Sequence, residues 1–336
     1  MENGKEKLWR AVPFVMAMLL VTLLPLQSAS AIFGRSKEAP AAADGAPIAQ
    51  NMEIRVYRNV PYSGTLKAVD NEGEAVSFAI AEQAKKGSVV IADDGEGFVY
   101  TPNQDKIGVD KFTYAATDES GNVSLPATVK ISIERTNSAV NYADMNGNAA
   151  ETAAVDLAEH GVFVGTKVGE SYFFEPERTL SRGEFIAMAM AATGQEVSAV
   201  SVTGFCDDES IPTWCKGYAV SALSSGVIYG VETEEGIAFD ANSEITLNEA
   251  AVVLNRLLSV TDVDLSSYNG AEAENAWCAQ AVANLQSVSI LQSGRFSSDE
   301  MRRGVTRETA AELLSAAMTL QEGRRSDRGL IGELFG

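Results

Sequence analysis

The stretch Leu180-Ser181-Arg182-Gly183-Glu184 recurs twice further along the chain. It returns as Ile245-Thr246-Leu247-Asn248-Glu249 and as Val305-Thr306-Arg307-Glu308-Thr309. The Ser/Thr positions are separated by 246 − 181 = 65 residues and then by 306 − 246 = 60 residues. Repetition at a nearly fixed period predicts one supersecondary unit that is used three times.

Each copy is typical of the start of a helix. Ser181 with Glu184, and Thr246 with Glu249, have the spacing of a capping box, in which each side chain bonds the other's backbone N–H. Thr306 has no Glu at this spacing. Apolar residues at i, i+3, i+4 and i+7 follow each cap and predict three equivalent helices with buried apolar faces. Helix capping is the preferred interpretation of the two glutamates.

The arginines in this motif need a different explanation. Arg182 and Arg307 occupy the first helical position, where a positive charge opposes the helix dipole by a few tenths of a kcal/mol. A guanidinium beside free backbone N–H groups suits a carboxylate or phosphate. The sequence therefore favours anion recognition over a solvated surface role for both arginines.

The N-terminus has the features of an export signal. A basic start precedes an apolar run over residues 11–26, and Ala29-Ser30-Ala31 matches a signal-peptidase site. A membrane anchor is the alternative, but the run is short and contains Pro13 and Pro25. We expect a signal peptide over residues 1–31, cleavage near Ala31, and an extracellular protein at the cell surface with no membrane association.

The charge of the chain limits its partners. The net charge is −20, and loss of residues 1–31 removes three basic and two acidic side chains, so the mature charge is −20 − 1 = −21. Such a chain repels nucleic acid, and this class of partner is excluded. Any anionic ligand must be held by local cations such as Arg182 and Arg307.

The sequence offers no catalytic constellation. His160 is the only histidine, and we expect it in the last turn of a helix that begins with a capping box of Asn148 and Glu151 and ends at Gly161. No nucleophile, metal cluster or cofactor motif accompanies it, so we expect no enzyme, no metal and no cofactor. Pairs of acidic residues leave glycosidase chemistry open.

The three cysteines are too few for a disulfide framework. Cys206 and Cys215 are close enough in sequence to pair in an oxidising compartment. Cys215 and Cys278 each follow a tryptophan and occupy equivalent repeat positions. Buried free thiols are the alternative.

Residues 47–135 have a β-strand pattern, after an Ala-rich segment over residues 32–46 that we interpret as a flexible linker. The predicted strands are Glu53–Tyr57, Thr65–Val69, Val76–Ile80, Ser88–Ala92, Gly97–Tyr100, Lys111–Thr117 and Ala127–Ile133. Short strands between turn residues predict an antiparallel β-sandwich. Asp70, Glu72 and Asp118 have side chains that could ligate calcium, although turn formation is the favoured role.

Three motifs in this region resemble bacterial Ig-like/cadherin-like repeats of surface proteins. They are Gly64-Thr65-Leu66-Lys67-Ala68-Val69-Asp70, Gly97-Phe98-Val99-Tyr100-Thr101-Pro102 and Gly108-Val109-Asp110-Lys111-Phe112-Thr113-Tyr114. The resemblance covers about 90 residues and implies a fold without implying a function.

The C-terminal half resembles the S-layer homology (SLH) domain. The motif blocks are an aromatic-x-Asp start at 142–144 and 205–207, glycine loops at 161–165 and 226–230, Phe-x-Pro at 174–176, and the recurrent cap. The resemblance implies a multidomain chain whose C-terminal part is an all-α, three-fold pseudosymmetric bundle. The implied repeats span residues 140–200, 201–264 and 265–322, and residues 323–336 form a C-terminal tail.

The same resemblance implies non-covalent anchoring to a secondary cell-wall polysaccharide, often a pyruvylated one. The expected ligand residues are Arg182, Arg307, Gly165, Gly230, Trp214 and Trp277. The tryptophans suit stacking on sugar, with burial in a helix core as the alternative. Because Leu247 replaces the arginine of the second copy and the third loop lacks its glycines, we expect at most two partial grooves.

The leading hypothesis is therefore a surface protein with an SLH anchor and an Ig-like spacer or adhesion module, which could also contact other surface proteins. One alternative is a structural subunit that assembles laterally into a surface layer. A cell-wall-modifying enzyme is the less favoured alternative, because no nucleophile is evident.

Overall fold

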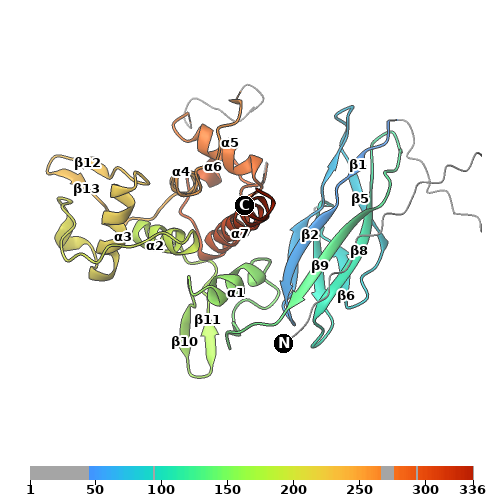
Figure 1. Cartoon of the computed structure of the whole chain (residues 1–336), viewed down its shortest axis with the longest axis horizontal. Coiled ribbons are helices and arrows are strands. Elements are labelled where there is room, and N and C mark those ends of the chain that lie inside the picture. The colour runs from blue at the N-terminus through green and yellow to red at the C-terminus, as the bar shows by residue number, and fades with distance from the viewer. Residues whose placement is uncertain (1–44, 94, 266–275, 293, 336) are drawn as a thin grey trace, which may run out of the picture. The chain divides into compact units, whose positions relative to one another are not determined.

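The computed structural model describes residues 45–93, 95–265, 276–292 and 294–335. The predicted signal peptide over residues 1–31, most of the predicted linker over 32–46 and the start of the predicted third repeat lie outside the described residues. Strands make up the N-terminal part of the described chain and helices dominate the rest (Figure 1). Of the helices in the described ranges, none combines the length and the apolar character that crossing a bilayer requires.

The N-terminal part is built from two main sheets. Their strand orders are β2-β9-β8-β5 and β3-β7-β6, and β1 pairs with β4. The strands are β1 (Ile48–Ala49), β2 (Met52–Tyr57), β3 (Tyr62–Thr65), β4 (Ala68–Val69), β5 (Ser77–Glu82), β6 (Gly87–Ile91), β7 (Gly97–Pro102), β8 (Gly108–Thr117) and β9 (Ala127–Glu134).

One pairing corrects the prediction of a purely antiparallel sandwich. Strand β2 pairs with β9 in parallel, in a register that runs from Met52 opposite Val129 to Tyr57 opposite Glu134. The other pairings of the sandwich are antiparallel. Strand β9 lies between β8 and β2 in the sheet. It runs antiparallel to β8 and parallel to β2.

The sandwich core follows from the period of two along each strand. Alternate residues of β9 are buried, namely Ala127, Val129, Ile131 and Ile133. Two fully buried tyrosines keep their hydroxyls bonded: Tyr100 donates to Asp110 at 3.0 Å, and Tyr114 donates to the carbonyl of Gln50 at 2.6 Å. These bonds offset the cost of burying the phenol groups.

The acidic turn residues of the sandwich bond their own backbone. Asp70 accepts from the N–H groups of Glu72 and Glu74, and Asp118 accepts from the N–H of Asn122. These bonds are typical of Asx turns. In the described part of the chain no group of three or more metal-ligating side chains comes together.

The C-terminal part is helical. Its helices are α1 (Glu151–Glu159), α2 (Arg182–Ala192), the short 3₁₀ helix η1 (Asp208–Ser210), α3 (Thr213–Ser224), α4 (Leu247–Leu258), α5 (Ala279–Ser287), α6 (Ser298–Met301) and α7 (Arg307–Phe335). The helices that were expected after each recurrent cap are α2, α4 and α7.

This part is not all-α, which corrects the prediction. Small antiparallel hairpins follow the glycine loops of the first two copies: β10 (Thr166–Val168) with β11 (Ser171–Phe173), and β12 (Val231–Thr233) with β13 (Gly236–Ala238). The described residues of the third copy contain no equivalent pair. The shorter spacing of the third copy, 60 instead of 65 residues, accounts for the difference.

Two helix ends also differ from the prediction. Helix α1 begins at Glu151 without a side-chain cap, and Asn148 instead accepts from the N–H of Ala150 at 2.7 Å. The capping box predicted for Asn148 and Glu151 is therefore wrong, because Glu151 itself is the first helical residue. At the other end of the chain, α7 continues to Phe335, through most of the segment predicted as a tail.

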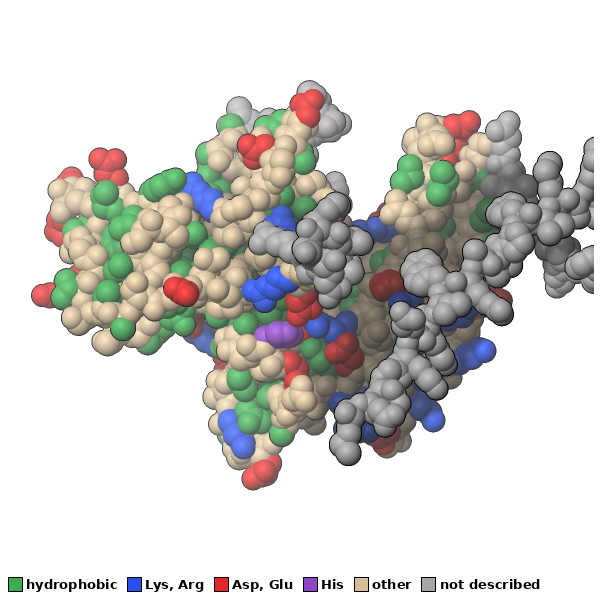
Figure 2. Space-filling model, viewed as in Figure 1, with side chains coloured by type: hydrophobic (Ala, Val, Ile, Leu, Met, Phe, Trp, Pro, Cys, Tyr) green, Lys and Arg blue, Asp and Glu red, His purple; other side chains and the backbone are tan. Residues whose placement is uncertain are grey.

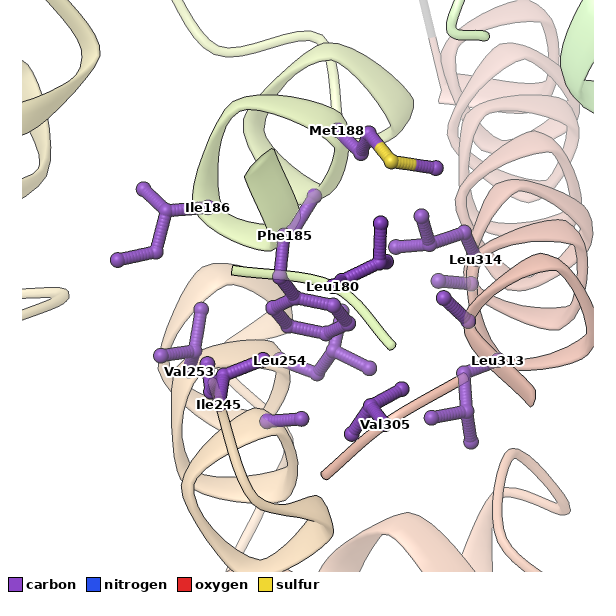
Figure 3. Packing of buried hydrophobic residues seen from close by; sticks show 14 of the residues in the cluster. Leu180, Phe185, Ile186, Met188, Ile245, Val253, Leu254, Val305, Leu313 and Leu314 are labelled. Atoms are coloured by element: carbon purple, nitrogen blue, oxygen red, sulfur yellow. The ribbon is translucent and has the colours of Figure 1, made fainter. Parts of the chain in front are cut away.

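A closed ring of backbone hydrogen bonds lies at the centre of the helical part. The N–H of Leu180 donates to Val305, that of Val305 to Ile245, and that of Ile245 to Leu180, at 2.8, 2.9 and 3.2 Å. Their side chains are at most 2% exposed and converge with those of Phe185 and Leu254 (Figure 3). Burial of each such side chain contributes roughly 1.5–3 kcal/mol to the stability of the fold. Because these side chains converge at one place, the three recurrent motifs share one core.

Candidate functional site

Three seams, each formed where one of the recurrent helices begins against a neighbouring repeat, are the candidate sites. The N–H of Arg182 donates to Ser243 and that of Leu247 to Arg303, at 2.8 and 3.1 Å. The N–H of Arg307 donates to the carbonyl of Arg178 at 2.8 Å. We name these contacts the Arg182, Leu247 and Arg307 seams.

The capping boxes hold the helix starts in place at two seams. Ser181 accepts from the N–H of Glu184, whose carboxylate accepts from the N–H of Ser181 at 2.9 Å. Thr246 and Glu249 form the same reciprocal pair. In the third copy Thr306 accepts from an N–H one turn along, but without a carboxylate that returns the bond. The structure thus places all five predicted capping residues at helix starts.

The backbone N–H groups at these starts are already used, which corrects the predicted anion site. In α2 the N–H of Arg182 bonds Ser243, that of Gly183 bonds Ala241 at 2.9 Å, and that of Glu184 bonds its own cap. In α7 the first two amides likewise bond carbonyls of the first repeat. A site made of free helix N–H groups is therefore absent at both starts, because the loops of the adjacent repeat supply the acceptors.

The guanidinium of Arg182 remains weakly paired. Its side chain is 12% exposed, and its Nη1 lies 3.6 Å from Glu249 Oε1, beyond hydrogen-bond distance. Its Nε is buried and has no hydrogen-bond partner in the described chain. A buried donor without an acceptor is costly, so this side chain offers directed donors to an oxyanion.

Arg307 differs in its Nη1, which is held inside the fold, although its Nε, like that of Arg182, is buried without a hydrogen-bond partner among the described residues. Its Nη1 donates to the Phe174 carbonyl and to the Glu175 carboxylate, both at 2.8 Å, and its guanidinium lies 4.9 Å from the Phe163 ring centroid. The residue is 4% exposed. A cation buried to this degree needs internal partners, and those partners make Arg307 a weaker candidate for ligand binding than the sequence predicted.

Gly165 and Gly230 occupy backbone positions that require glycine. Their φ angles are +76° and +78°, in the left-handed region. A Cβ at Gly165 would lie 2.4 Å from the Phe173 carbonyl oxygen. The Gly165 loop meets the guanidinium of Arg307 through Phe163, so the Gly165 loop belongs to the Arg307 seam and not to the Arg182 seam.

Sequence reasoning missed the residues that hold these loops. Asp144 accepts from the N–H groups of Phe174 and Glu175 at 2.9 and 2.7 Å, and Asp207 makes the equivalent two bonds one repeat later. Glu175 has a φ of +54°, a strained value for a non-glycine residue. The aromatic-x-Asp motif was the available signal, since it predicts a repeated acceptor at the same place.

The two candidate tryptophans lie on the surface. Trp214 is 53% exposed and Trp277 is 61% exposed. The alternative interpretation, that they are core residues, is therefore wrong. Tyr229, in the second glycine loop, is also exposed and packs against the Arg256 guanidinium at 4.6 Å. The exposed rings of Trp214, Trp277 and Tyr229 are available for stacking on the apolar face of a sugar.

Cys206 and Cys215 are free thiols. The pairing considered for Cys206 and Cys215 is absent, because Cys206 lies at the surface while Cys215 is buried. Burial raises the pKa of the Cys215 thiol to about 11. Cys278 is likewise buried, so the buried-thiol alternative holds for two of the three cysteines.

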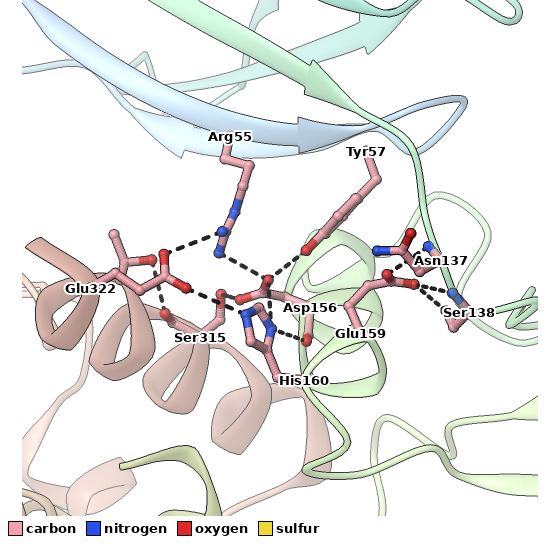
Figure 4. A network of polar contacts seen from close by, with 10 residues as sticks. Arg55, Tyr57, Asn137, Ser138, Asp156, Glu159, His160, Ser315 and Glu322 are labelled. Atoms are coloured by element: carbon pink, nitrogen blue, oxygen red, sulfur yellow. Dashed lines mark hydrogen bonds and ion pairs between the residues drawn. The ribbon is translucent and has the colours of Figure 1, made fainter. Parts of the chain in front are cut away.

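A polar network centred on Asp156 of α1 includes strand β2 and α7 (Figure 4). Asp156 is 2% exposed and accepts from Tyr57 at 2.7 Å, from Arg55 at 3.1 Å and from Ser315 at 2.7 Å. Burial, together with the adjacent Asp156 carboxylate, raises the pKa of Tyr57 well above its ordinary value. This network could not be predicted from the sequence, because its members are far apart along the chain.

His160 was predicted in the last turn of this helix, and the structure places it directly after that turn, as the C-cap of α1. Its Nδ1 lies 2.9 Å from the Asp156 carbonyl oxygen and its Nε2 lies 3.4 Å from the Glu322 carboxylate. The side chain is 35% exposed, and acidic and basic side chains surround it on the surface (Figure 2). These contacts stabilise the end of the helix and bring no nucleophile to the imidazole.

Comparison with known proteins supports the β-sandwich and a relation to surface proteins. Residues 39–135 match the model of the bacterial cadherin-like domain. The chain is 29% identical over 124 residues to the "Surface-layer 125 kDa protein" of Lysinibacillus sphaericus, a match that covers 37% of this chain and 10% of that protein. The chain therefore aligns with only about a tenth of this relative's length.

Solved structures match at low identity over less than a third of the chain. An endo-fucoidan hydrolase of glycoside hydrolase family 107 is 16% identical over 30% of this chain and 15% of that chain, with a TM-score of 0.24. A mutant of the SrpA adhesin from Streptococcus sanguinis is 18% identical over 30% of this chain and 61% of that chain, with a TM-score of 0.21. On the family match and the observed elements, the described chain has a β-rich N-terminal part similar to bacterial cadherin-like domains, followed by a helical part.

Proposed function

We propose that residues 140–322 form three SLH repeats that anchor an exported chain, without a covalent bond, to a secondary cell-wall polysaccharide. The cadherin-like sandwich then acts as a spacer or adhesion module. Three features support three-fold pseudosymmetry: the closed ring of Leu180, Ile245 and Val305, the recurrent caps, and the equivalent bonds at the three seams. The similarity to a protein named for the surface layer supports a cell-surface location.

The observation that carries the proposal is the weakly paired guanidinium of Arg182. Its buried Nε has no acceptor in the described chain, and its ion pair with Glu249 is long. A carboxylate on the polymer, such as that of a pyruvyl ketal, would bind the accessible part of the guanidinium, which can donate two parallel hydrogen bonds. Because the whole chain carries a net charge of −20, recognition of an anion must depend on such a local donor.

The three seams are expected to contribute unequally. The Arg307 seam has its cation committed to Phe174 and Glu175, so it contributes mainly to the fold. The Leu247 seam has an apolar residue, 3% exposed, in place of the cation. We therefore assign the principal binding role to the Arg182 seam, with Trp214 and Trp277 as candidate stacking residues on the surface.

The remaining parts of the proposal concern location and chemistry. The basic start and the apolar run support export with cleavage near Ala31. The acidic charge argues against nucleic acid as a partner. We propose a binding role without catalysis. The name of the Lysinibacillus sphaericus relative favours a second candidate, a subunit of a surface layer, in which the sandwich would contact other surface proteins.

Binding isotherms on purified cell-wall sacculi test the role of Arg182. We expect Arg182→Ala to weaken binding by about 1.5–3 kcal/mol, the contribution of a charged hydrogen bond. Arg182→Lys should weaken it less, because an ammonium keeps the charge but loses the paired geometry. Arg58→Ala is the matched control, since it removes an exposed arginine from the sandwich. Equal affinities for folded wild type and Arg182→Ala, with folding checked by circular dichroism, would overturn the proposal.

A further inference from the structure

The loops that follow the first helix of each repeat have the same backbone geometry. The N–H of Gly161, Gly226 and Ser289 donates to the carbonyl three residues earlier, at 3.0–3.1 Å. The φ angles of these residues are +67°, +72° and +60°. The next two amides in each loop bond one shared helix carbonyl, at Leu157, Ala222 or Leu285. The three loops are therefore structurally equivalent, although the third has lost its first glycine.

The third loop keeps the left-handed conformation with a residue that rarely adopts it. Serine in place of glycine at this position adds a side chain, and the Ser289 hydroxyl accepts from Lys67 Nζ of the sandwich at 3.0 Å. Three residues further on, Gln292 Nε2 donates to the Thr65 hydroxyl at 3.1 Å. The two side chains that distinguish this loop from its equivalents therefore both contact the sandwich. Ser289 contacts Lys67, just after strand β3, and Gln292 contacts Thr65, the last residue of that strand.

In the described part of the chain, the equivalent positions of the other loops make no side-chain hydrogen bond to the sandwich. Gly161 and Gly226 have no side chain, and the residues equivalent to Gln292 are Val164 and Tyr229, which are 39% and 65% exposed. The change in the third loop is therefore specific to the third repeat, although the first repeat also contacts the sandwich through α1.

The third loop adjoins the Leu247 seam, which has also lost its cation. Leu247 replaces arginine and is buried, with its N–H bonded to Arg303. A cavity of about 110 Å³ beside it is lined by Asn248, Leu291, Gln292 and Phe296, among other residues. The loss of the guanidinium and the change of the loop thus affect one seam, and Gln292 belongs both to its lining and to the contact with the sandwich.

Buried contacts between the sandwich and the helical part accompany the two surface hydrogen bonds of Ser289 and Gln292. Tyr57, at the end of β2, is 4% exposed and belongs to the apolar core of the helical part. Its hydroxyl and the Arg55 guanidinium bond the buried Asp156. Thr152 of α1 donates to the Pro61 carbonyl at 2.6 Å. The segment between sandwich and helices is also held, since Glu159 accepts from the N–H groups at 137 and 138.

We propose that the third-repeat loop, Ser289–Gln292, is the docking surface for the chain's own β-sandwich and no longer a ligand loop. The buried contacts of Tyr57 and Asp156 stabilise the docked state, and the two loop side chains fix its register. In this arrangement the sandwich is a rigid extension of the helical part, and polymer recognition is left mainly to the Arg182 seam.

Amide hydrogen exchange of the full mature chain tests this inference without any polymer. The double variant Ser289→Gly/Gln292→Val gives the third loop residues that the first loop already has, so the loop geometry should persist. Loss of the two bonds should raise exchange at residues 62–67 by about threefold or more, because local opening becomes easier. Tyr229→Val, at the equivalent position of the second loop, is the matched control and should leave that exchange unchanged.

A reciprocal variant distinguishes loss of docking from an effect that is confined to the third loop. Thr65→Ala/Lys67→Ala removes the same two bonds from the sandwich side, and exchange at residues 285–292 should then rise. Unchanged exchange at the opposite partner in both variants, in chains with wild-type circular dichroism, would overturn the docking role.

Discussion

At the scale of single residues, burial and pairing separate two arginines that look equivalent in the sequence. Arg307 is bonded to Phe174 and Glu175 and stacks on Phe163, whereas the guanidinium of Arg182 pairs with a carboxylate of the described chain only at 3.6 Å, that of Glu249. The capping chemistry around them could be predicted from the sequence, because it is local. Their different availability could not be predicted, since it depends on which carbonyls and carboxylates a neighbouring repeat supplies.

Thiol labelling tests the burial of the cysteines. Cys206 is exposed, while Cys215 and Cys278 are buried, and the raised pKa of Cys215 disfavours its reactive thiolate. In the native protein we expect one thiol per chain to react rapidly with a thiol reagent at pH 8, and all three after denaturation. Cys206→Ser should abolish the rapid phase. Two or more rapid thiols in the native chain would contradict these positions.

The pH dependence of stability offers a test at Asp208. Hydrogen bonds from Lys216 and Thr203 lower the pKa of this carboxyl to about 2, from an unfolded value of about 3.9. A lowered carboxyl pKa stabilises the fold above the unfolded pKa, and this stabilisation is lost as pH falls through the folded pKa. We therefore expect the melting temperatures of wild type and Asp208→Asn to differ most above pH 4 and to converge between about pH 4 and 2. A constant difference over that range would rule out the linkage.

At the scale of elements, much of the fold could be predicted from periodicity. The predicted strand at residues 97–100 lies within β7, and the predicted strand at residues 111–117 lies within β8. The helices after the recurrent caps are α2, α4 and α7. The parallel pairing of β2 with β9, and the hairpins after the glycine loops, could not be predicted. Pairing partners depend on contacts between distant segments, whereas alternation and capping are local signals.

The glycine loops allow a matched test of backbone geometry. Gly165 and Gly169 both have positive φ, but only at Gly165 would a Cβ collide with a backbone oxygen, at 2.4 Å from Phe173. Gly169→Ala should cost roughly 1–2 kcal/mol of unfolding free energy from the left-handed conformation alone. Gly165→Ala should cost about 1–3 kcal/mol more, because the loop must move. Urea unfolding measures both values, and equal shifts of the midpoint would contradict the predicted collision.

At the scale of the whole molecule, an acidic chain is proposed to hold an anionic polymer through very few cations. The closed ring of three motifs fixes the seams relative to one another, and the seams then diverge in chemistry. One keeps a weakly paired guanidinium, one uses its guanidinium internally, and one contacts the sandwich through Ser289 and Gln292. The three seams therefore differ in role because different residues occupy equivalent positions of one repeated backbone.

The most direct test of the central claim is binding of the mature chain to sacculi before and after extraction of the secondary polymer. Saturable binding to intact sacculi is expected, and extraction should reduce it to the background level, because the peptidoglycan that remains lacks the anionic substituent that Arg182 is proposed to bind. A mature chain that binds extracted sacculi as tightly as intact ones, or that binds neither, would contradict the account.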